Sequence, residues 1–198
     1  MLEFESKIWN AGLKKIAGVD EAGRGPLAGP VVAAAVIFPE GYYNEDINDS
    51  KKLSPAKREK LYDVICRNAV CYNVAMIDNN VIDEINILNA TFAAMKSAIR
   101  GLVCKPDHLL IDGNRFCEFD IPFSLIVKGD SKSISIAAAS ILAKVTRDRI
   151  MNELTFEYPE YKLAKHKGYG TKEHIELIKY FGKSPIHRKS FLLKGIDY

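Results

Sequence analysis

The sequence lacks a long hydrophobic stretch. None of its apolar runs approaches the ~18 to 20 residues that a membrane-spanning helix needs, and its first residues lack the basic-then-apolar order of a secretory signal. Both absences argue against a membrane protein and against an exported one. We therefore expect a protein of the cytoplasm with no membrane partner.

Cysteine is scarce, and its spacing excludes two common frameworks. Cys66, Cys71, Cys104 and Cys117 form no C-x-x-C pair and have no zinc-like spacing with the four histidines. A disulfide scaffold and a structural zinc site are therefore not indicated, and we expect reduced thiols. No internal repeat or low-complexity linker divides the chain. With 198 residues, 47% of them hydrophobic, it can bury one core, with a small appended segment.

Net charge is low, at +3, but the charges are unevenly distributed. Residues 162–198 contain nine Lys or Arg and three acids, which leaves a net charge of −3 on the first 161 residues. A basic segment beside an acidic body suits an enzyme that acts on nucleic acid, because basic side chains bind phosphates and metal ions offset repulsion among clustered acids. A lysine-rich surface that is only solvated is the alternative explanation.

The most informative motif is an acidic pair followed at once by a glycine-rich loop. One segment has the sequence GVDEAGRGP, with Asp20 and Glu21 at the end of a short apolar run. Adjacent carboxylates repel one another unless a hard cation such as Mg²⁺ or Mn²⁺ neutralises them. Gly23 and Gly25 let a ligand approach the backbone N–H groups closely. The planar guanidinium group of Arg24 can donate two hydrogen bonds to a phosphate. The motif indicates a phosphodiester or nucleotide site, with a solvated turn as the alternative.

Two more strand-like runs end on an acid. The run HLLID ends at Asp112, and the run SLIVKGD ends at Asp130. In α/β sheets, ligands bind beyond the carboxyl ends of strands, where side chains from different strands converge. The four acids of these three runs are therefore predicted to share one cavity, although up to 110 positions separate them. They are Asp20, Glu21, Asp112 and Asp130.

Hydrophobic periodicity and capping residues predict an order of strands and helices. The predicted strands cover residues 15–19, 30–38 and 70–77 and the runs that end at the two later acids. The predicted helices cover residues 54–68, 87–100, 133–156 and 171–182. The first two strands should form a hairpin around the glycine loop. Ser131, Ser133 and Ser135 are candidate caps for the long helix, whose positive amino end should face the acids.

Five blocks of sequence resemble ribonuclease HII, the bacterial type 2 ribonuclease H, over nearly the whole chain. They are GVDEAGRGPLAGP at 18–30, DSKKLS at 49–54, IDG at 111–113, KGDSKSISIAAASILAK at 128–144 with TRD at 146–148, and HKGYGTKEH at 166–174. Five blocks in order are more specific than any one of them. The resemblance implies an α/β fold, a ribonuclease H-like mixed β-sheet flanked by helices with a small helical C-terminal segment. It also implies one catalytic domain over residues 1–198, in which about 162–198 is a basic substrate-binding segment.

The resemblance implies roles for individual residues. Acids at four positions bind two catalytic divalent ions, Mg²⁺ or Mn²⁺, and these positions are Asp20, Glu21, Asp112 and Asp130. A Gly-Arg-Gly loop recognises the ribonucleotide, and an aromatic residue on a glycine-flanked loop stacks at the RNA–DNA junction. For the two lysines of the DSKKLS block, the resemblance favours contact with phosphate over simple exposure to solvent. The implied substrate contacts are Gly23, Arg24, Gly25, Lys51, Lys52 and Tyr169.

The implied activity is endonucleolytic hydrolysis of RNA–DNA hybrids or of duplex DNA with embedded ribonucleotides. Cleavage falls on the 5′ side of the ribonucleotide and leaves a 5′-phosphate and a 3′-hydroxyl. In the two-metal mechanism, one ion activates water and the other stabilises the leaving oxygen. The 2′-hydroxyl distinguishes RNA from DNA, and the backbone of residues 23–25 is our candidate for recognising it. The sequence names no protein partner.

Two other functional classes compete with this interpretation. Gly23, Gly25 and Gly29 after a strand resemble a variant dinucleotide fingerprint, which would indicate an oxidoreductase. That fingerprint requires a helix after its last glycine, whereas residues 30–38 have the pattern of a strand. A non-catalytic hybrid-binding module is the second alternative, but four converging acids would weaken its affinity for phosphate.

We expect structural roles for several of the remaining residues. Lys144 and Asp148 have the i,i+4 spacing of an ion pair on a helix. Arg147 lies beside them in the sequence, and contact with nucleic acid is an alternative role for it. His166 and His174 are ordinary polar or hydrogen-bonding histidines in this interpretation and are left out of the metal site. Phe4 and Trp9 are expected to cover the core.

Overall fold

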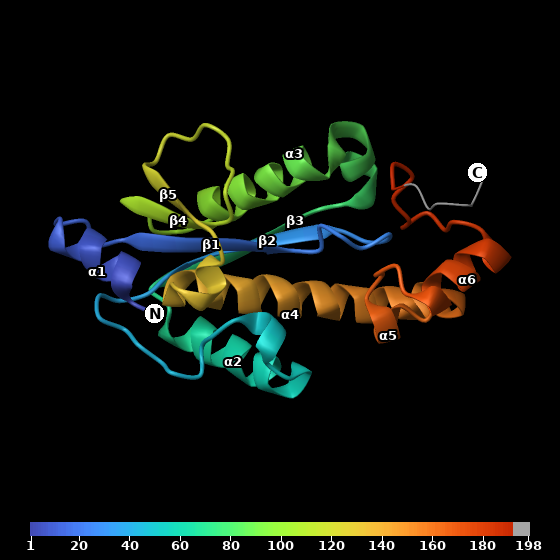
Figure 1. The fold of residues 1–198 in the computed structure, drawn as a ribbon, viewed down its shortest axis with the longest axis horizontal. Coiled ribbons are helices and arrows are strands. Elements are labelled where there is room, and N and C mark those ends of the chain that lie inside the picture. The colour runs from blue at the N-terminus through green and yellow to red at the C-terminus, as the bar shows by residue number, and fades with distance from the viewer. Residues whose placement is uncertain (192–198) are drawn as a thin grey trace.

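The structure of the protein is a computed structural model that describes residues 1–191. A five-stranded mixed β-sheet forms the middle layer, with α3 on one face and α4 on the other (Figure 1). The helices are α1 (Glu3–Asn10), α2 (Pro55–Asn68), α3 (Asn79–Arg100), α4 (Ile134–Glu157), α5 (Leu163–His166) and α6 (Lys172–Phe181). The strands are β1 (Ile16–Ala22), β2 (Val31–Ile37), β3 (Cys71–Ile77), β4 (His108–Asp112) and β5 (Phe123–Ile126). The last seven residues of the predicted basic segment lie outside the described residues.

The strand order across the sheet is β3-β2-β1-β4-β5. β2 pairs antiparallel with both β1 and β3, which confirms the predicted opening hairpin. β4 lies parallel to both β1 and β5. Because β1 and β4 run in the same direction, their carboxyl ends meet at one edge of the sheet, and both of these ends carry acids.

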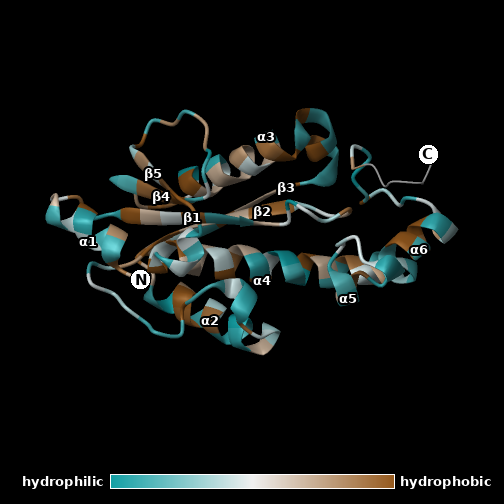
Figure 2. Cartoon of the chain, viewed as in Figure 1, coloured by the Kyte–Doolittle hydropathy of each residue, from teal (hydrophilic) through white to brown (hydrophobic). Residues whose placement is uncertain are grey.

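The two faces of the sheet have separate hydrophobic cores. Every residue of β2 is buried, as predicted for a strand covered on both sides. Ala33 and Ala35 face the α3 side, whereas Val32 and Ala34 face the α4 side. Figure 2 shows hydrophobic residues along β2 and hydrophilic residues over much of α2, which lies against α4 and farther from the sheet. Among residues 1–191, no helix combines the length and apolarity needed to cross a bilayer.

Helix α4 packs unusually close to β1. A Cβ atom on Gly18 would lie 2.1 Å from the carbonyl carbon of Ser135, so only glycine fits at this point of the strand. The small residues predicted near the start of the helix, including Ala137 and Ala138, are fully buried against the sheet side. This contact fixes the acidic end of β1 relative to the amino end of α4.

The amino end of α4 has two acceptors. Ser133 Oγ accepts the N–H of Ile136, so Ser133 is the cap among the three candidate serines, whereas Ser131 donates to a carbonyl of its own turn. The buried Glu5 carboxylate accepts hydrogen bonds from Ser133 Oγ at 2.6 Å and from the Ser135 N–H at 3.1 Å. Glu5 belongs to α1, a short helix that the sequence analysis did not predict.

Most other predicted elements agree with the structure within a few residues. Ser54 and Thr171 cap α2 and α6 as expected. Helix α3 begins at Asn79, eight residues before the predicted start. Asn86, at φ 64° and ψ 164°, interrupts it, and its side chain caps the segment that follows. The predicted helix is therefore the second of two segments.

A small separate core joins the end of α4 to the C-terminal helices and contains Met151, Tyr161, Leu163 and Ile178. Trp9 is buried at the other end of the molecule with Phe4 packed against its cluster, as predicted.

Three buried histidines connect the loops beside this C-terminal core. The Ser184 N–H donates to Nδ1 of His187, so Nε2 of His187 carries the proton and donates to Nε2 of His174 at 3.1 Å. His174 in turn donates from Nδ1 to the carbonyl of Tyr169 at 2.9 Å. His166 stacks on His174, with ring centroids 4.2 Å apart. These are hydrogen-bonding residues, and the whole chain of bonds requires neutral rings.

We expect the buried histidines to lower the free energy of unfolding as the pH falls from 7 to 5, against an opposing contribution from Asp20, Glu21 and Asp112, whose pKa values are raised. Burial, and then repulsion from neighbouring histidines, lowers the pKa of His174 and His187 to about 4. An unfolded histidine has a pKa of about 6.5, so the unfolded chain binds more protons in this window and stability is lost as the pH falls. Integrated over this window, each histidine contributes a loss of about 2 kcal/mol, so the two together should contribute about 4 kcal/mol in urea unfolding measured at each pH.

The control for this prediction is His187→Gln, whose side chain does not titrate. It should be less stable at pH 7, and its free energy of unfolding should fall by about 2 kcal/mol less than that of the wild type between pH 7 and pH 5, because the acids contribute equally in both proteins. An identical pH dependence in the two proteins would contradict the assignment.

Candidate functional site

The structure brings the predicted acids to one edge of the sheet. Asp20 and Glu21 lie among the last three residues of β1, Asp112 ends β4, and the pairing of Val19 with Ile111 sets the two strand ends side by side. The fourth acid, Asp130, lies in the short 3-10 helix Gly129–Ser131 that precedes α4. Asp112 Oδ1 accepts the N–H of Gly129 at 2.6 Å, which ties the end of β4 to the turn that carries Asp130.

Three of the four acids line a cleft of about 250 Å³. Its walls come from β1, the glycine loop, the DSKKLS segment, α4 and the loop of the aromatic residue. The lining residues are Asp20, Glu21, Ala22, Gly23, Arg24, Gly25, Ser50, Lys51, Asp112, Ser140, Lys144 and Tyr169. Asp130 adjoins this cleft rather than lining it, through an ion pair of 3.3 Å between its Oδ2 and Lys51 Nζ.

The surroundings of the acids that line the cleft raise their pKa values. Burial raises the pKa of Asp20 well above its usual value, and the charges of Glu21 and Asp112 raise it further. Burial also raises the pKa of Glu21, although Arg24 opposes this shift. The pKa of Asp112 is raised by burial and by Asp130, against the hydrogen bond from Gly129. The cleft therefore favours any cation or proton that relieves the repulsion.

The donor set suits a hard divalent cation. All of the donors are carboxylate oxygens, and Asp20 is only 4% exposed with two acids acting on it. Within residues 1–191, no three His, Cys, Asp or Glu side chains are grouped closely enough to hold one ion between them. Mg²⁺ is usually bound by one or two carboxylates together with substrate phosphates, so an open arrangement of this kind fits it without a closed protein cage.

The glycine loop turns sharply beside the acids. Gly23 has φ +100°, a conformation that side chains rarely tolerate. Arg24 is half-exposed, and its Nη1 lies 3.3 Å from Glu21 Oε1. The chain after Gly29 continues into β2, so the helix that a dinucleotide fingerprint requires is missing at this point, as predicted.

The remaining predicted contacts differ in their positions. Lys51 lines the cleft and pairs with Asp130, whereas Lys52 is exposed outside the lining and lies 3.8 Å from Asp49. Tyr169 is exposed in the cleft, as predicted, with the Lys144 ammonium 5.7 Å from its ring centre.

Two serines of the cleft were not predicted from the sequence. Ser50 and Ser140 share a hydrogen bond of 2.9 Å, and Ser140 also hydrogen-bonds Asp20, which opposes the rise in its pKa. A polar residue at the end of an alanine run, four positions before Lys144, was the available signal. The predicted ion pair of Lys144 with Asp148 is confirmed at 2.7 Å. The option that Arg147 contacts nucleic acid is wrong, because its side chain is fully buried.

The basic segment has fewer free cations than its composition indicates. Lys162 and Lys165 both pair with Glu173, at 3.1 and 2.6 Å. Arg188 is fully buried. The charge that faces solvent is therefore smaller than a residue count predicts.

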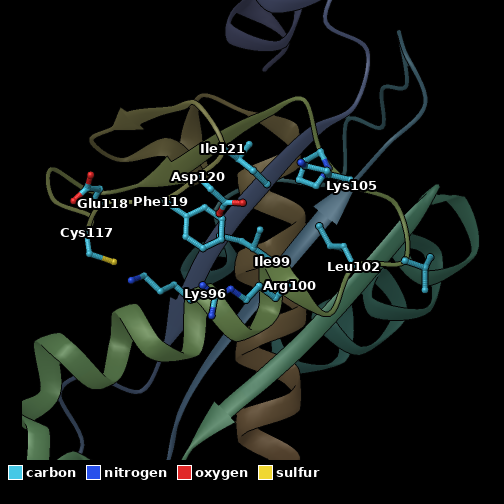
Figure 3. A pocket seen from close by; sticks show the side chains of 12 residues that line it. Lys96, Ile99, Arg100, Leu102, Lys105, Cys117, Glu118, Phe119, Asp120 and Ile121 are labelled. Carbon is cyan, nitrogen blue, oxygen red and sulfur yellow. The ribbon is translucent and has the colours of Figure 1, made fainter.

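A larger cleft, of about 900 Å³, lies at the opposite end of the sheet (Figure 3). Its walls are the end of α3 and the segments that lead into β4 and β5. The lining mixes cations such as Lys96 and Arg100 with acids such as Glu118 and apolar side chains such as Phe119. Its two acids, Glu118 and Asp120, come from one segment before β5 and share the lining with three cations, so size alone does not identify the site.

Comparison with known proteins identifies the family. The family model described as Ribonuclease HII matches residues 17–194. The chain is 56% identical to ribonuclease HII of Caldicellulosiruptor saccharolyticus, over 96% of this chain and 93% of that protein. It is 58% identical to ribonuclease HII of Clostridioides difficile, over 96% of this chain and 74% of that protein.

A solved structure agrees with the fold. The crystal structure of ribonuclease H2 from Pyrococcus horikoshii matches with a TM-score of 0.75 at 30% identity, covering 89% of this chain and 93% of that one. The predicted ribonuclease H-like sheet is thereby confirmed. The chain belongs to the ribonuclease HII family and is an endoribonuclease of the ribonuclease H type, the activity that hydrolyses RNA in RNA–DNA hybrids.

Proposed function

We propose that the enzyme cleaves the phosphodiester on the 5′ side of a ribonucleotide, in RNA–DNA hybrids and in duplex DNA with embedded ribonucleotides. The products would carry a 5′-phosphate and a 3′-hydroxyl. The observation that carries this proposal is the cleft in which acids from two strands, the buried Asp20 and the partly buried Glu21 and Asp112, face a glycine loop and an exposed aromatic residue. Such a cleft offers a place for a phosphate, a sugar and a base next to one another.

Two divalent ions, Mg²⁺ or Mn²⁺, would be held by the four acids Asp20, Glu21, Asp112 and Asp130. When bound, they would supply an activated water and offset the charge of the transition state. The repulsion among Asp20, Glu21 and Asp112 supports this assignment, because a cation at this position stabilises all three carboxylates. The Gly129 N–H keeps Asp112 oriented by its bond to Oδ1.

The other residues of the cleft would bind and orient the nucleic acid. Lys51 and Arg24 are each paired with an acid, and each could exchange that partner for a phosphate when the acids bind cations. The exposed Lys52 would contact the backbone outside the cleft. Gly23, Arg24 and Gly25 would recognise the ribose, and Tyr169 would stack at the junction between RNA and DNA. The basic segment from residue 162 onward would bind the flanking duplex.

A cleavage assay tests the proposal directly. Duplexes with none, one or four consecutive ribonucleotides are compared, and the ends of the products are mapped. We expect no cleavage of the all-DNA duplex and a cut on the 5′ side of a ribonucleotide in the others. Products that carry a 3′-phosphate would contradict the proposed chemistry.

Asp112→Asn should lower turnover at least about 100-fold while duplex binding stays nearly unchanged. The substitution removes an anionic oxygen but retains an acceptor for the Gly129 N–H. Without metal, the melting temperature should stay the same or rise, because a neutral side chain removes repulsion from the cleft. Asp63→Asn, at an exposed acid of α2, is the matched control and should keep full turnover. Near wild-type turnover of Asp112→Asn at saturating Mg²⁺ would refute the metal assignment.

Tyr169→Ala should reduce cleavage at a single embedded ribonucleotide much more than it reduces stability. Changes at exposed side chains usually alter stability by no more than about 0.5 kcal/mol. Tyr169→Phe should restore most of the loss if stacking dominates. Tyr43→Ala, at a tyrosine that is 56% exposed and lies outside the proposed contacts, provides the control. A Tyr169→Ala protein that melts far lower but cuts normally per folded molecule would make this residue structural.

A further inference from the structure

Two buried arginines lie next to the cleft without a carboxylate partner. Arg147 on α4 and Arg188 after α6 are both fully buried, and among the described residues neither forms an ion pair. Burial lowers the pKa of Arg147 to about 10 and that of Arg188 to about 9, so both remain charged at neutral pH. Burial of an unpaired charge is costly unless hydrogen bonds satisfy it, so the partners of these guanidinium groups are informative.

Arg188 donates to main-chain carbonyls of the glycine loop. Its Nη2 lies 2.6 Å from the carbonyl oxygen of Gly23, and its Nη1 lies 2.9 Å from that of Arg24. Nε and Nη2 both donate to Gly29, at 3.1 and 2.9 Å. The ring of Phe191 lies 4.9 Å from the guanidinium carbon. One side chain from the C-terminal segment thus binds both ends of the loop.

Arg147 binds the adjoining backbone in the same way. It donates from Nε to Pro30, from Nη2 to Ala28 and from Nη1 to Lys167, at 3.0 to 3.1 Å. A Cβ atom on Gly23 would lie 2.2 Å from Nε of Arg147, so the loop passes directly over this side chain.

The bonds of Arg188 determine the direction of two N–H groups. In a trans peptide the C=O and N–H point in opposite directions, and the chain has no cis peptide. Because the carbonyls of Gly23 and Arg24 point at Arg188, the N–H groups of Arg24 and Gly25 point away from it. No hydrogen bond among residues 1–191 uses either N–H. Both residues line the cleft, so two free donors are available to a ligand there.

We propose that Arg188, supported by Arg147, is a positioning residue that orients the N–H groups of Arg24 and Gly25 toward the 2′-hydroxyl of the substrate. This inference rests on the proposed function of the cleft. It makes the C-terminal segment part of the mechanism of sugar recognition, in addition to any contact that it makes with flanking DNA. Lysine cannot replace Arg188, because a single ammonium group lacks the planar fork that spans three carbonyls.

The test compares binding of two duplexes that differ by one 2′-hydroxyl, with Ca²⁺ in place of Mg²⁺, by fluorescence anisotropy. Arg188→Lys keeps the charge and should lower the preference for the ribonucleotide-containing duplex about tenfold, the loss expected for hydrogen bonds that are no longer well oriented. Its affinity for the all-DNA duplex should stay near that of wild type. Lys189→Gln, at the exposed neighbouring cation, should leave the preference unchanged.

A second measurement on the unmodified enzyme covers the case in which Arg188→Lys does not fold. The backbone amide resonances of Arg24 and Gly25 should shift on addition of the ribonucleotide-containing duplex and remain largely unshifted with the all-DNA duplex. An unchanged preference in folded Arg188→Lys, or equal amide shifts with both duplexes, would overturn the inference. A wild-type enzyme that neither prefers nor cleaves the ribonucleotide-containing duplex would instead overturn the proposed function.

Discussion

The parallel pairing of β1 with β4 is the constraint on which the site depends. This pairing brings Asp20 and Glu21 next to Asp112, although β2, β3 and two long helices lie between the two strands in the sequence. The close contact of Gly18 with the first turn of α4 then fixes the position of β1 relative to this helix, which begins shortly after Asp130. A larger residue at Gly18 would separate the strand from the helix and so move the acids of β1 relative to Asp130.

In the free enzyme, the clustered carboxylates at this edge of the sheet repel one another. Burial and mutual repulsion raise the pKa values of Asp20, Glu21 and Asp112, and the half-exposed Arg24 and the exposed Lys51 offset part of the charge. Surface pairs of this kind contribute little to stability. They are therefore available for exchange, and in the proposed function cations and phosphate that enter together would relieve a repulsion that the protein alone does not remove.

The cations of the C-terminal segment serve two physical purposes. Lysines such as Lys172 remain at the surface, where a duplex can reach them. Arg188 and the neutral chain of His187 and His174 are buried and connect the segment to the glycine loop and to the carbonyl of Tyr169. Substitutions among the buried residues should alter recognition, whereas those among surface lysines should alter affinity for any duplex.

Local sequence determined much of this protein. The strand that carries Asp20, the caps Ser54 and Ser133, and the long helix α4 follow from periodicity and capping within short windows. The convergence of Asp20, Glu21 and Asp112 was also predictable, because strand ends converge in α/β sheets, whereas Asp130 lies in a 3-10 helix beside the cleft and not at a strand end. The break in α3 at Asn86 and the burial of Glu5 against α4 were decided by packing between distant segments. Only the tertiary structure showed that Arg188 is a buried hydrogen-bond donor, because a charged residue has the same local pattern whether its neighbours are water or carbonyl oxygens.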